Sequence, residues 1–286
     1  MFTERERCNI TVQESLCAWI DLLGYGKAFY ESDWNLYDER AVNNLYRIQA
    51  LQDFVLQINN PFCETIFTLN DGVIYNFDFS SSATSLMNWL IDIILKFDRI
   101  DSFDKANGYY GARGVVAYGH RARYNAYDSQ GRGEFIATSE EKKKEYNKKT
   151  IVYSPNELQM NTAFSKANII EEGGSSKGLK HNKLHFDENV LRVLAEKINE
   201  IGSQEFLRVD GLDPIVYRYK AEFCESKRRF IVKAYCDDIS WDCLVVEFEK
   251  PIAYDEPKRN IKTNLYIPVK IKEALYSPEE PAIQKI

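Results

Sequence analysis

The sequence predicts an α+β sandwich in which helices cover a mostly antiparallel sheet, followed by a strand-rich C-terminal extension. Three observations predict this fold class. Helical patterns alternate with short apolar runs as far as Ile201. Asn70-Asp71-Gly72 separates two strand-like runs, which is the signal of an antiparallel hairpin. After Gly202 the pattern changes to strands.

The first elements are expected in the order strand, helix, hairpin, helix. The apolar run 16–20 ends in Asp21 and a glycine turn, which is typical of a buried central strand. Between Asp38 and Ile58, apolar residues recur at helical spacing, and Pro61 stops that helix. The hairpin strands are 65–69 and 73–77, and a helix capped at 80–82 covers 86–97.

The remaining elements follow from the same patterns. We expect a strand at 113–119, a polar insertion at 120–150, a strand at 151–153 and a helix at 154–171. A strand at 183–186 and a helix capped by Asp187 should follow. The last elements expected are strands at 215–219, 230–235 and 244–248 and an irregular tail interrupted by prolines. The chain is therefore expected to divide into a main domain, 12–201, and an extension, 202–286.

Composition excludes several classes of protein. The net charge of −6 gives no basic face for nucleic acid. The longest apolar stretch, 86–97, is broken by polar residues, so we expect no membrane association and a cytoplasmic protein. Six cysteines contain no CxxC pair, and three histidines have no metal-ligand spacing. We therefore expect free thiols and surface histidines.

Two acidic residues stand out by their positions. Asp21 ends the buried strand, and Asp71 lies at the tip of the hairpin. A carboxylate beside an apolar run is costly unless a cation pairs with it. If the two strands are neighbours, the carboxylates converge, and converging like charges favour a divalent metal. The residues alone are equally compatible with a turn residue at Asp71 and a helix cap at Asp21.

Three segments resemble the motifs of class III nucleotidyl cyclases. AWIDLLGYGKAF at 18–29 resembles the family's first-strand motif, and TLNDGVIYNF at 68–77 resembles its second metal-binding segment. ARGVVAYG at 112–119 is similar to its arginine-containing central strand. The order also agrees, and the likeness covers residues 15–200. Within the family, the opening and the third segment are most similar to the pyrimidine cyclases of bacterial Pycsar anti-phage systems.

The resemblance implies a homodimeric enzyme with composite active sites that converts UTP or CTP to a 3′,5′-cyclic monophosphate and pyrophosphate in anti-phage defence. Residues 12–201 would be its catalytic domain. Asp21 and Asp71 would hold two Mg²⁺ or Mn²⁺ ions. The phosphates would be bound by main-chain N–H groups of Leu22, Leu23, Gly24 and Tyr25. A downstream cyclic-nucleotide effector would be only an indirect partner.

The resemblance also implies an asparagine and a cation on a helix of the second subunit. The matching helix is MNTAFSKANIIEE at 160–172, in which Asn161 fits the ribose-binding position. The family's arginine position holds Ser165, so we expect the adjacent Lys166 to supply the charge, with Arg113 as the alternative. Tyr46 is a candidate for narrowing the base pocket, and a core position is its alternative.

Two classes of function stay open. One is an active cyclase, favoured by the presence of both Asp21 and Asp71. The other is a catalytically silent, cyclase-like module that binds a nucleotide or a partner protein. Lys166 lies one helical step, about 100°, from the expected direction, and this is the main departure from the family pattern. The sequence does not separate UTP from CTP, or a pyrimidine from a purine.

Overall fold

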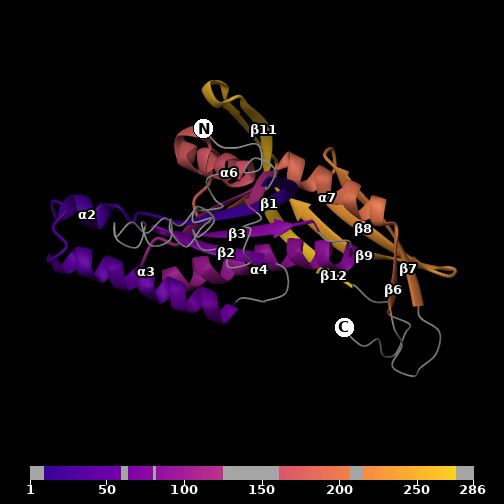
Figure 1. Ribbon diagram of the computed structural model, residues 1–286, viewed down its shortest axis with the longest axis horizontal. Coiled ribbons are helices and arrows are strands. Elements are labelled where there is room, and N and C mark those ends of the chain that lie inside the picture. Colours follow the sequence, from indigo (N-terminus) through magenta and orange to yellow (C-terminus); the bar gives the residue numbers. More distant parts are fainter. Residues whose placement is uncertain (1–9, 59–63, 80–81, 125–160, 207–214, 275–286) are drawn as a thin grey trace, which may run out of the picture.

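The computed structural model describes residues 10–58, 64–79, 82–124, 161–206 and 215–274. Their strands form two sheets, with helices packed on the faces of the first (Figure 1). The expected α+β sandwich is therefore confirmed. The expected strand 151–153, the insertion from 125 to 150 and the first part of the expected helix 154–171 lie outside the described residues.

The first sheet has a long central strand, β1 (Ile10–Leu22). Its neighbours are β3 (Gly72–Asp78) and β4 (Ala112–Tyr124), both antiparallel to it. Beyond β3 lies β2 (Glu64–Leu69), which completes the predicted hairpin. Beyond β4 lies β5 (Leu184–Asp187), and this pair is parallel. The carboxyl end of β1 therefore lies between the hairpin turn and the start of β4.

Helices cover both faces of this sheet. α3 (Glu39–Ile58) and α4 (Ala83–Ala106) lie on one side, where residues such as Leu51 and Leu86 join the core beneath β1. α6 (Thr162–Gly173) lies on the other side, against β1 and β4. A short helix, α2 (Lys27–Glu31), follows β1. The Ser82 hydroxyl accepts the Ser85 N–H at 3.2 Å, so the expected serine cap of α4 is confirmed.

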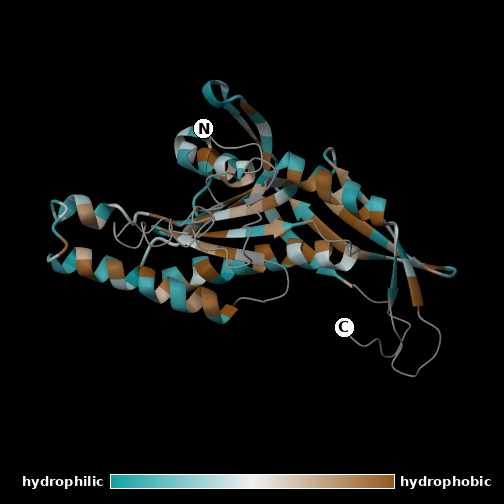
Figure 2. Ribbon diagram, in the orientation of Figure 1, coloured by the Kyte–Doolittle hydropathy of each residue, from teal (hydrophilic) through white to brown (hydrophobic). Residues whose placement is uncertain are grey.

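The second sheet follows α7 (Glu188–Ile201), which turns an apolar side toward the strands and a hydrophilic side outward (Figure 2). Its strands are β6 (Ser203–Phe206), β7 (Ile215–Cys224), β8 (Arg229–Cys236), β9 (Ile239–Phe248) and β12 (Pro268–Glu273), in the order β12-β9-β8-β7-β6. The three strands expected at 215–248 are thus present. One continuous cluster of buried apolar residues joins both sheets.

The prediction of an irregular tail was wrong. β10 (Ile252–Glu256), a 3₁₀ turn (Pro257–Arg259) and β11 (Ile261–Tyr266) form a hairpin that joins the first sheet through β5. β12 pairs with β9. Pro257 and Pro268 stand at the first position of a turn and of an edge strand, where a missing N–H is tolerated. Strands after Gly202 therefore divide between the two sheets.

Two polar residues differ from the expectations. Asp187 is the N-cap residue of α7 as expected, but its carboxylate accepts no hydrogen bond from the helix and instead binds Lys166 and Thr263. His185 is buried in β5, with its ring between the Gly114 carbonyl and the Lys180 N–H. His120 and His181 are exposed as expected. The cysteines in the described part of the chain are free, and none of the described helices is long and apolar enough to cross a bilayer.

Candidate active site

Asp21 lies in a row of residues that crosses the first sheet. It is paired with Gly72 of β3 on one side and with Arg113 of β4 on the other. Side chains directly opposite each other in antiparallel strands share a face. This is the face covered by α6, because Cys17 and Trp19 of the same strand pack with α6 residues. Asp21 and Arg113 therefore lie side by side beneath α6.

The hairpin turn brings Asp71 to the same place. The Leu22 N–H donates to the Asp71 carbonyl at 3.2 Å, and the Asp21 and Asp71 carboxyls are close enough to hydrogen-bond. Gly72 lies against the Trp19 ring and has no side chain to hold the two apart, since a Cβ there would be 2.1 Å from the ring. The two carboxylates that the sequence singled out thus converge.

The surroundings of Asp21 disfavour its charge. Burial raises the pKa of Asp21 to about 8, with further contributions from the negative charges of Glu171 and Asp71. Arg113 and Arg47 oppose this increase. Burial also raises the pKa of Asp71. Without a cation the pair therefore favours a shared proton over two negative charges.

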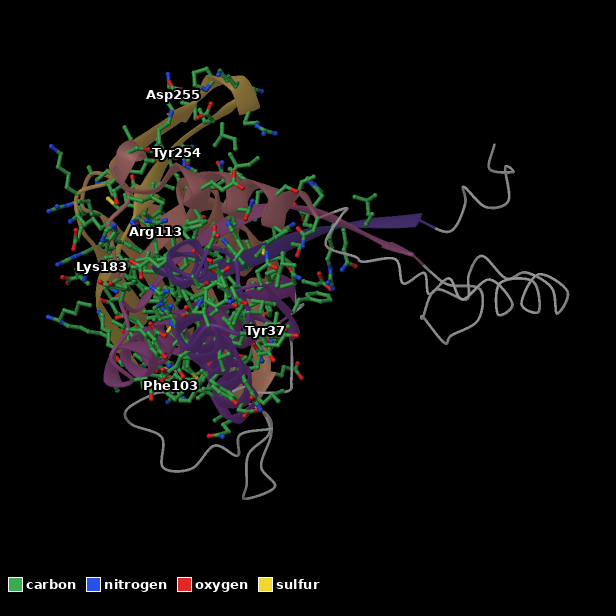
Figure 3. All side chains as sticks on the ribbon, turned by 90° about the vertical axis from the view of Figure 1, so that its left-hand side faces the viewer. Tyr37, Phe103, Arg113, Lys183, Tyr254 and Asp255 are labelled. Atoms are coloured by element: carbon green, nitrogen blue, oxygen red, sulfur yellow. The ribbon has the colours of Figure 1, made fainter. Side chains whose placement is uncertain are left out.

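Arg113 is held by a carboxylate from α6. Its Nε donates to Glu171 Oε1 at 2.8 Å, and its Nη2 binds the same oxygen. Nη2 also donates to the Glu171 carbonyl at 3.3 Å. Both side chains are buried, with exposed fractions of 11% and 8%. In Figure 3, Arg113 lies between Tyr254 of β10 and Phe103 of α4, in the middle layer of the fold.

The donor chemistry of Asp21 and Asp71 fits a divalent cation. Mg²⁺ is commonly held by one or two carboxylates together with substrate phosphates and water, and two carboxyls that otherwise share a proton supply such a pair. Among the described residues, no group of three or more His, Cys, Asp or Glu side chains is arranged to hold a metal ion. Asp21 and Asp71 would therefore supply two protein ligands, and the remaining ligands would have to come from the substrate and water.

The raised pKa predicts how stability depends on pH. In an unfolded chain Asp21 ionises near pH 4, whereas in the folded protein its pKa is about 8. Unfolding therefore releases a proton between about pH 4 and about pH 8, so the free energy of unfolding of the metal-free protein falls as pH rises through this window. Urea unfolding at several pH values measures this slope.

Asp21→Asn is the matched variant, because its side chain stays neutral at every pH. This variant should remove the part of the pH dependence of the free energy of unfolding that Asp21 contributes. Since a metal needs the deprotonated carboxylate, added Mn²⁺ should stabilise the wild type more at about pH 8 than at about pH 6. Equal slopes for wild type and variant would contradict the assignment.

The predicted phosphate-binding amides are only partly available. The Leu22 N–H is bound to Asp71, and the Leu23 N–H donates to the Gly111 carbonyl at 2.9 Å. Gly24 and Tyr25 donate no main-chain hydrogen bond within the described residues. The expectation that the main-chain N–H groups of Leu22 and Leu23 bind phosphate is therefore corrected. These two N–H groups instead join the end of β1 to the hairpin turn and to the residue before β4.

Asn161 and Lys166 are engaged within their own chain. The Asn161 side chain accepts the Phe164 N–H at 2.9 Å, capping α6, and donates to Asn76 at 2.8 Å. It is 1% exposed. Lys166 Nζ binds the buried Asp187 at 2.5 Å. The structure therefore does not bring these two side chains to Asp21 and Asp71, because each satisfies a buried polar partner elsewhere.

Tyr46 is exposed on α3, so the alternative of a core position was wrong. It lines an open cavity of about 220 Å³ between α3 and α4, together with residues that include Arg47, Phe103 and Tyr109. Arg47 also contacts the Leu23 carbonyl. The cavity thus adjoins the turn after Asp21 from the α3 side.

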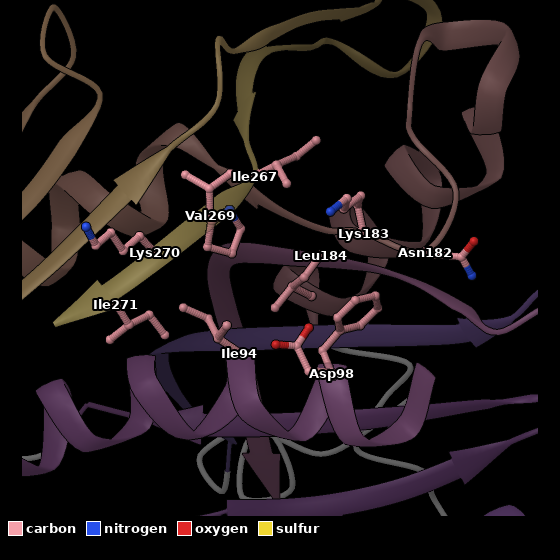
Figure 4. A pocket seen from close by; sticks show the side chains of 11 residues that line it. Ile94, Asp98, Asn182, Lys183, Leu184, Ile267, Val269, Lys270 and Ile271 are labelled. Carbon is pink, nitrogen blue, oxygen red and sulfur yellow. The ribbon is translucent and has the colours of Figure 1, made fainter. Parts of the chain in front are cut away.

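A second cavity of about 220 Å³ lies between α4, β5 and β12 (Figure 4). Asp98 and Lys183 lie at its wall, and apolar residues such as Phe97 and Leu184 also line it. Phe97 and Leu184 belong to the core on the α4 side of the sheet. This cavity is therefore on the face opposite Asp21.

Sequence reasoning missed Glu171 as well as Asn44 and Arg47 of α3. Glu171 was within the expected helix 154–171, but its partner Arg113 comes 58 residues earlier. The apolar stripe expected on α3 was Val42, Leu45, Ile48, Leu51, Phe54, Val55 and Ile58. The structure buries Leu51 and Val55 as expected, but it also buries Asn44 and Arg47 and leaves Leu45 exposed. Asn44 and Arg47 lie seven and four residues before Leu51, and this helical spacing was the signal in the sequence that they share its buried side.

Comparisons with known proteins give structural likenesses only. No family model matches the chain, and no curated protein does. The catalytic core of a rhodopsin-guanylyl cyclase with converted specificity, in complex with ATPalphaS, has a TM-score of 0.40 at 12% identity, covering 92% of this chain and 99% of that one. The non-canonical dimeric guanylyl cyclase domain of the RhoGC fusion protein from Blastocladiella emersonii has a TM-score of 0.36 at 11% sequence identity. This match covers 92% of this chain and 98% of that one.

An adenylate/guanylate cyclase/hydrolase from Silicibacter pomeroyi has a TM-score of 0.32 at 14% identity, covering 73% of this chain and 96% of that one. None of these likenesses reaches a TM-score of 0.5, so the function is inferred below from the residues of this chain.

Proposed function

We propose that the protein is a metal-dependent nucleotidyl cyclase that converts a pyrimidine nucleoside triphosphate, UTP or CTP, into its 3′,5′-cyclic monophosphate and pyrophosphate. The observation that carries the proposal is the convergence of Asp21 and Asp71 beside Arg113. The three motifs that resemble class III cyclases contribute one of these residues each. Anti-phage defence and the preference for a pyrimidine base rest on the motif resemblance alone.

In this reaction the ribose 3′-oxygen attacks the α-phosphorus, its proton departs, and the bond to pyrophosphate breaks. Bound divalent ions would lower the pKa of the 3′-hydroxyl and offset the triphosphate charge. Asp21 and Asp71 would hold them, and the closeness of the two carboxyls supports this role. Arg113, directly opposite Asp21 in the sheet, is a candidate cation for the phosphates, but its guanidinium would first have to exchange Glu171 for a phosphate oxygen.

The homodimer belongs to the proposal. In it, α6 of the second subunit would approach the nucleotide, with Asn161 on the ribose and Lys166 as the cation. Each of these side chains has a partner in its own chain, so each would have to leave that partner in the assembled site. For Lys166 this carries a cost, because its departure would take the cation from Asp187, whose side chain is 0% exposed.

A catalytically silent module is the second candidate, and a specific observation favours it. The cap made by Asn161 and the Lys166–Asp187 ion pair give both residues structural roles that need no substrate. Converging carboxylates favour the enzyme, because their mutual repulsion opposes folding and a bound cation relieves it.

The test is incubation of the purified protein with Mn²⁺ or Mg²⁺ and each of ATP, GTP, CTP and UTP in turn, with products resolved by mass spectrometry. A cyclic monophosphate from UTP or CTP alone, absent with Asp71→Ala, is the expected result. A purine product would keep the cyclase and overturn the pyrimidine assignment. No product from any triphosphate would favour the silent module.

A further inference from the structure

Two polar side chains on the inner side of α3 need an explanation. Asn44 and Arg47 are each 5% exposed, and α3 packs on the core through Leu51 and Val55. A buried polar group is costly unless it is hydrogen-bonded. The partners of these side chains therefore indicate what they do.

Both side chains bind the turn that follows Asp21. Asn44 Nδ2 donates to the Tyr25 carbonyl at 2.6 Å, and Arg47 Nη2 donates to the Leu23 carbonyl at 3.1 Å. The carbonyl between them, that of Gly24, accepts the Lys27 N–H at 3.3 Å. The carbonyls of Leu23 and Tyr25, on either side of Gly24 in one short turn, thus both point toward α3.

Arg47 is itself fixed from a second helix. Its Nε and Nη2 bind the two Asp104 oxygens at 2.8 and 2.7 Å, and its guanidinium lies 4.5 Å from the centre of the Tyr109 ring. Asp104 also accepts the Gly111 N–H at 2.8 Å, and the Gly111 carbonyl accepts the Leu23 N–H. The turn, α3, α4 and the start of β4 therefore form one buried network.

Peptide planarity then sets the direction of the amides. In a trans peptide the C=O of one residue and the N–H of the next point in opposite directions. With the Leu23 and Tyr25 carbonyls held toward α3, the N–H groups of Gly24 and Gly26 point away from it. Away from α3 is the face of the sheet that carries Asp21. No hydrogen bond between described residues uses either N–H.

We infer that Asn44 and Arg47 are positioning residues, which orient the turn so that the amides of Gly24 and Gly26 bind the oxyanions of a triphosphate beside Asp21 and Asp71. The inference rests on the proposed function for the identity of the ligand. The side chains act through the turn and touch neither substrate nor metal. Their effect is therefore on the binding of the phosphate chain.

Arg47→Lys and Asn44→Ala test this in the full-length protein. Lysine keeps the charge beside Asp104, but one ammonium cannot reproduce the fork that reaches both Asp104 and Leu23. We expect each variant to raise the KM for the metal–nucleotide about tenfold, with kcat and the Mn²⁺ affinity within about twofold. The metal affinity stays because the β1–β3 pairing, which these residues do not touch, holds the two carboxylates.

Arg121→Lys is the matched control. Arg121 is also a buried arginine paired with an aspartate, Asp78, but it lies at the other end of the β1–β4 ladder. This variant should leave KM unchanged. An unchanged KM in folded Arg47→Lys and Asn44→Ala, or an equal rise in Arg121→Lys, would overturn the inference.

The same variants separate this inference from the proposed function. If the wild type forms no cyclic product, calorimetric titration of the Mn²⁺-loaded protein with inorganic tripolyphosphate replaces the kinetic readout. About tenfold weaker binding by Arg47→Lys and Asn44→Ala than by wild type and Arg121→Lys would then support the oriented turn without cyclisation. Equal binding by all four proteins, or no binding by the wild type, would overturn it.

Discussion

Asp21→Asn should abolish cyclic nucleotide formation while leaving the protein folded and at least as stable. The amide has the shape of the carboxylate but cannot supply the charge that a divalent ion needs. Loss of several kcal/mol of metal-derived stabilisation of the transition state corresponds to a decrease in rate of about 10³-fold. Product formation is measured by mass spectrometry, and stability by thermal unfolding without metal.

The gain in stability has a separate physical reason. Asp21 is buried beside Asp71 and Glu171, and this raises its pKa to about 8. A side chain that is neutral at every pH removes the cost of burying the carboxylate, or of protonating it when the chain folds near neutral pH. Asp98→Asn, on the opposite face of the sheet (Figure 4), is the control for activity and should leave product formation unchanged. Full activity in Asp21→Asn would rule out its role as a metal ligand.

Gly72→Ala should destabilise the protein and separate the two carboxylates. The added Cβ would lie 2.1 Å from the Trp19 ring, and Trp19 is 5% exposed, so the ring has little room to move. Overpacking of this kind costs about 1–3 kcal/mol. This exceeds the roughly 0.4–1 kcal/mol that alanine gains by restricting the unfolded chain. Urea unfolding measures the loss, and Mn²⁺ titration reports the separation.

Gly26→Ala is the matched control in the same region. The three atoms nearest its Cβ would all belong to the Tyr30 side chain, the first at 3.3 Å, and Tyr30 is 67% exposed, so it can shift toward solvent. We expect a change in stability of less than about 1 kcal/mol. If Gly72→Ala proved as mild as this control, close packing of Trp19 on Gly72 would not be what brings β3 to β1.

The local pattern of the sequence determined most elements and the two carboxylates. Short apolar runs, the Asn70-Asp71-Gly72 turn and the serine cap of α4 each involve only a few neighbouring residues, so they can be recognised without the fold. The ends of β1 and of the hairpin are such local features, and these are the positions of Asp21 and Asp71. The convergence of Asp21 and Asp71 was predicted on the assumption that the first strand and the hairpin are neighbours, and the pairing of β1 with β3 confirms that assumption.

Only the tertiary structure decided which partners the buried polar groups find. Arg113 binds Glu171, Asn161 caps α6, Lys166 binds Asp187, and the polar side of α3 holds the turn after Asp21. It also decided that the strands after Gly202 divide between two sheets. Strand pairing and the satisfaction of buried charges depend on residues far apart in the chain, and periodicity within one segment carries no information about them.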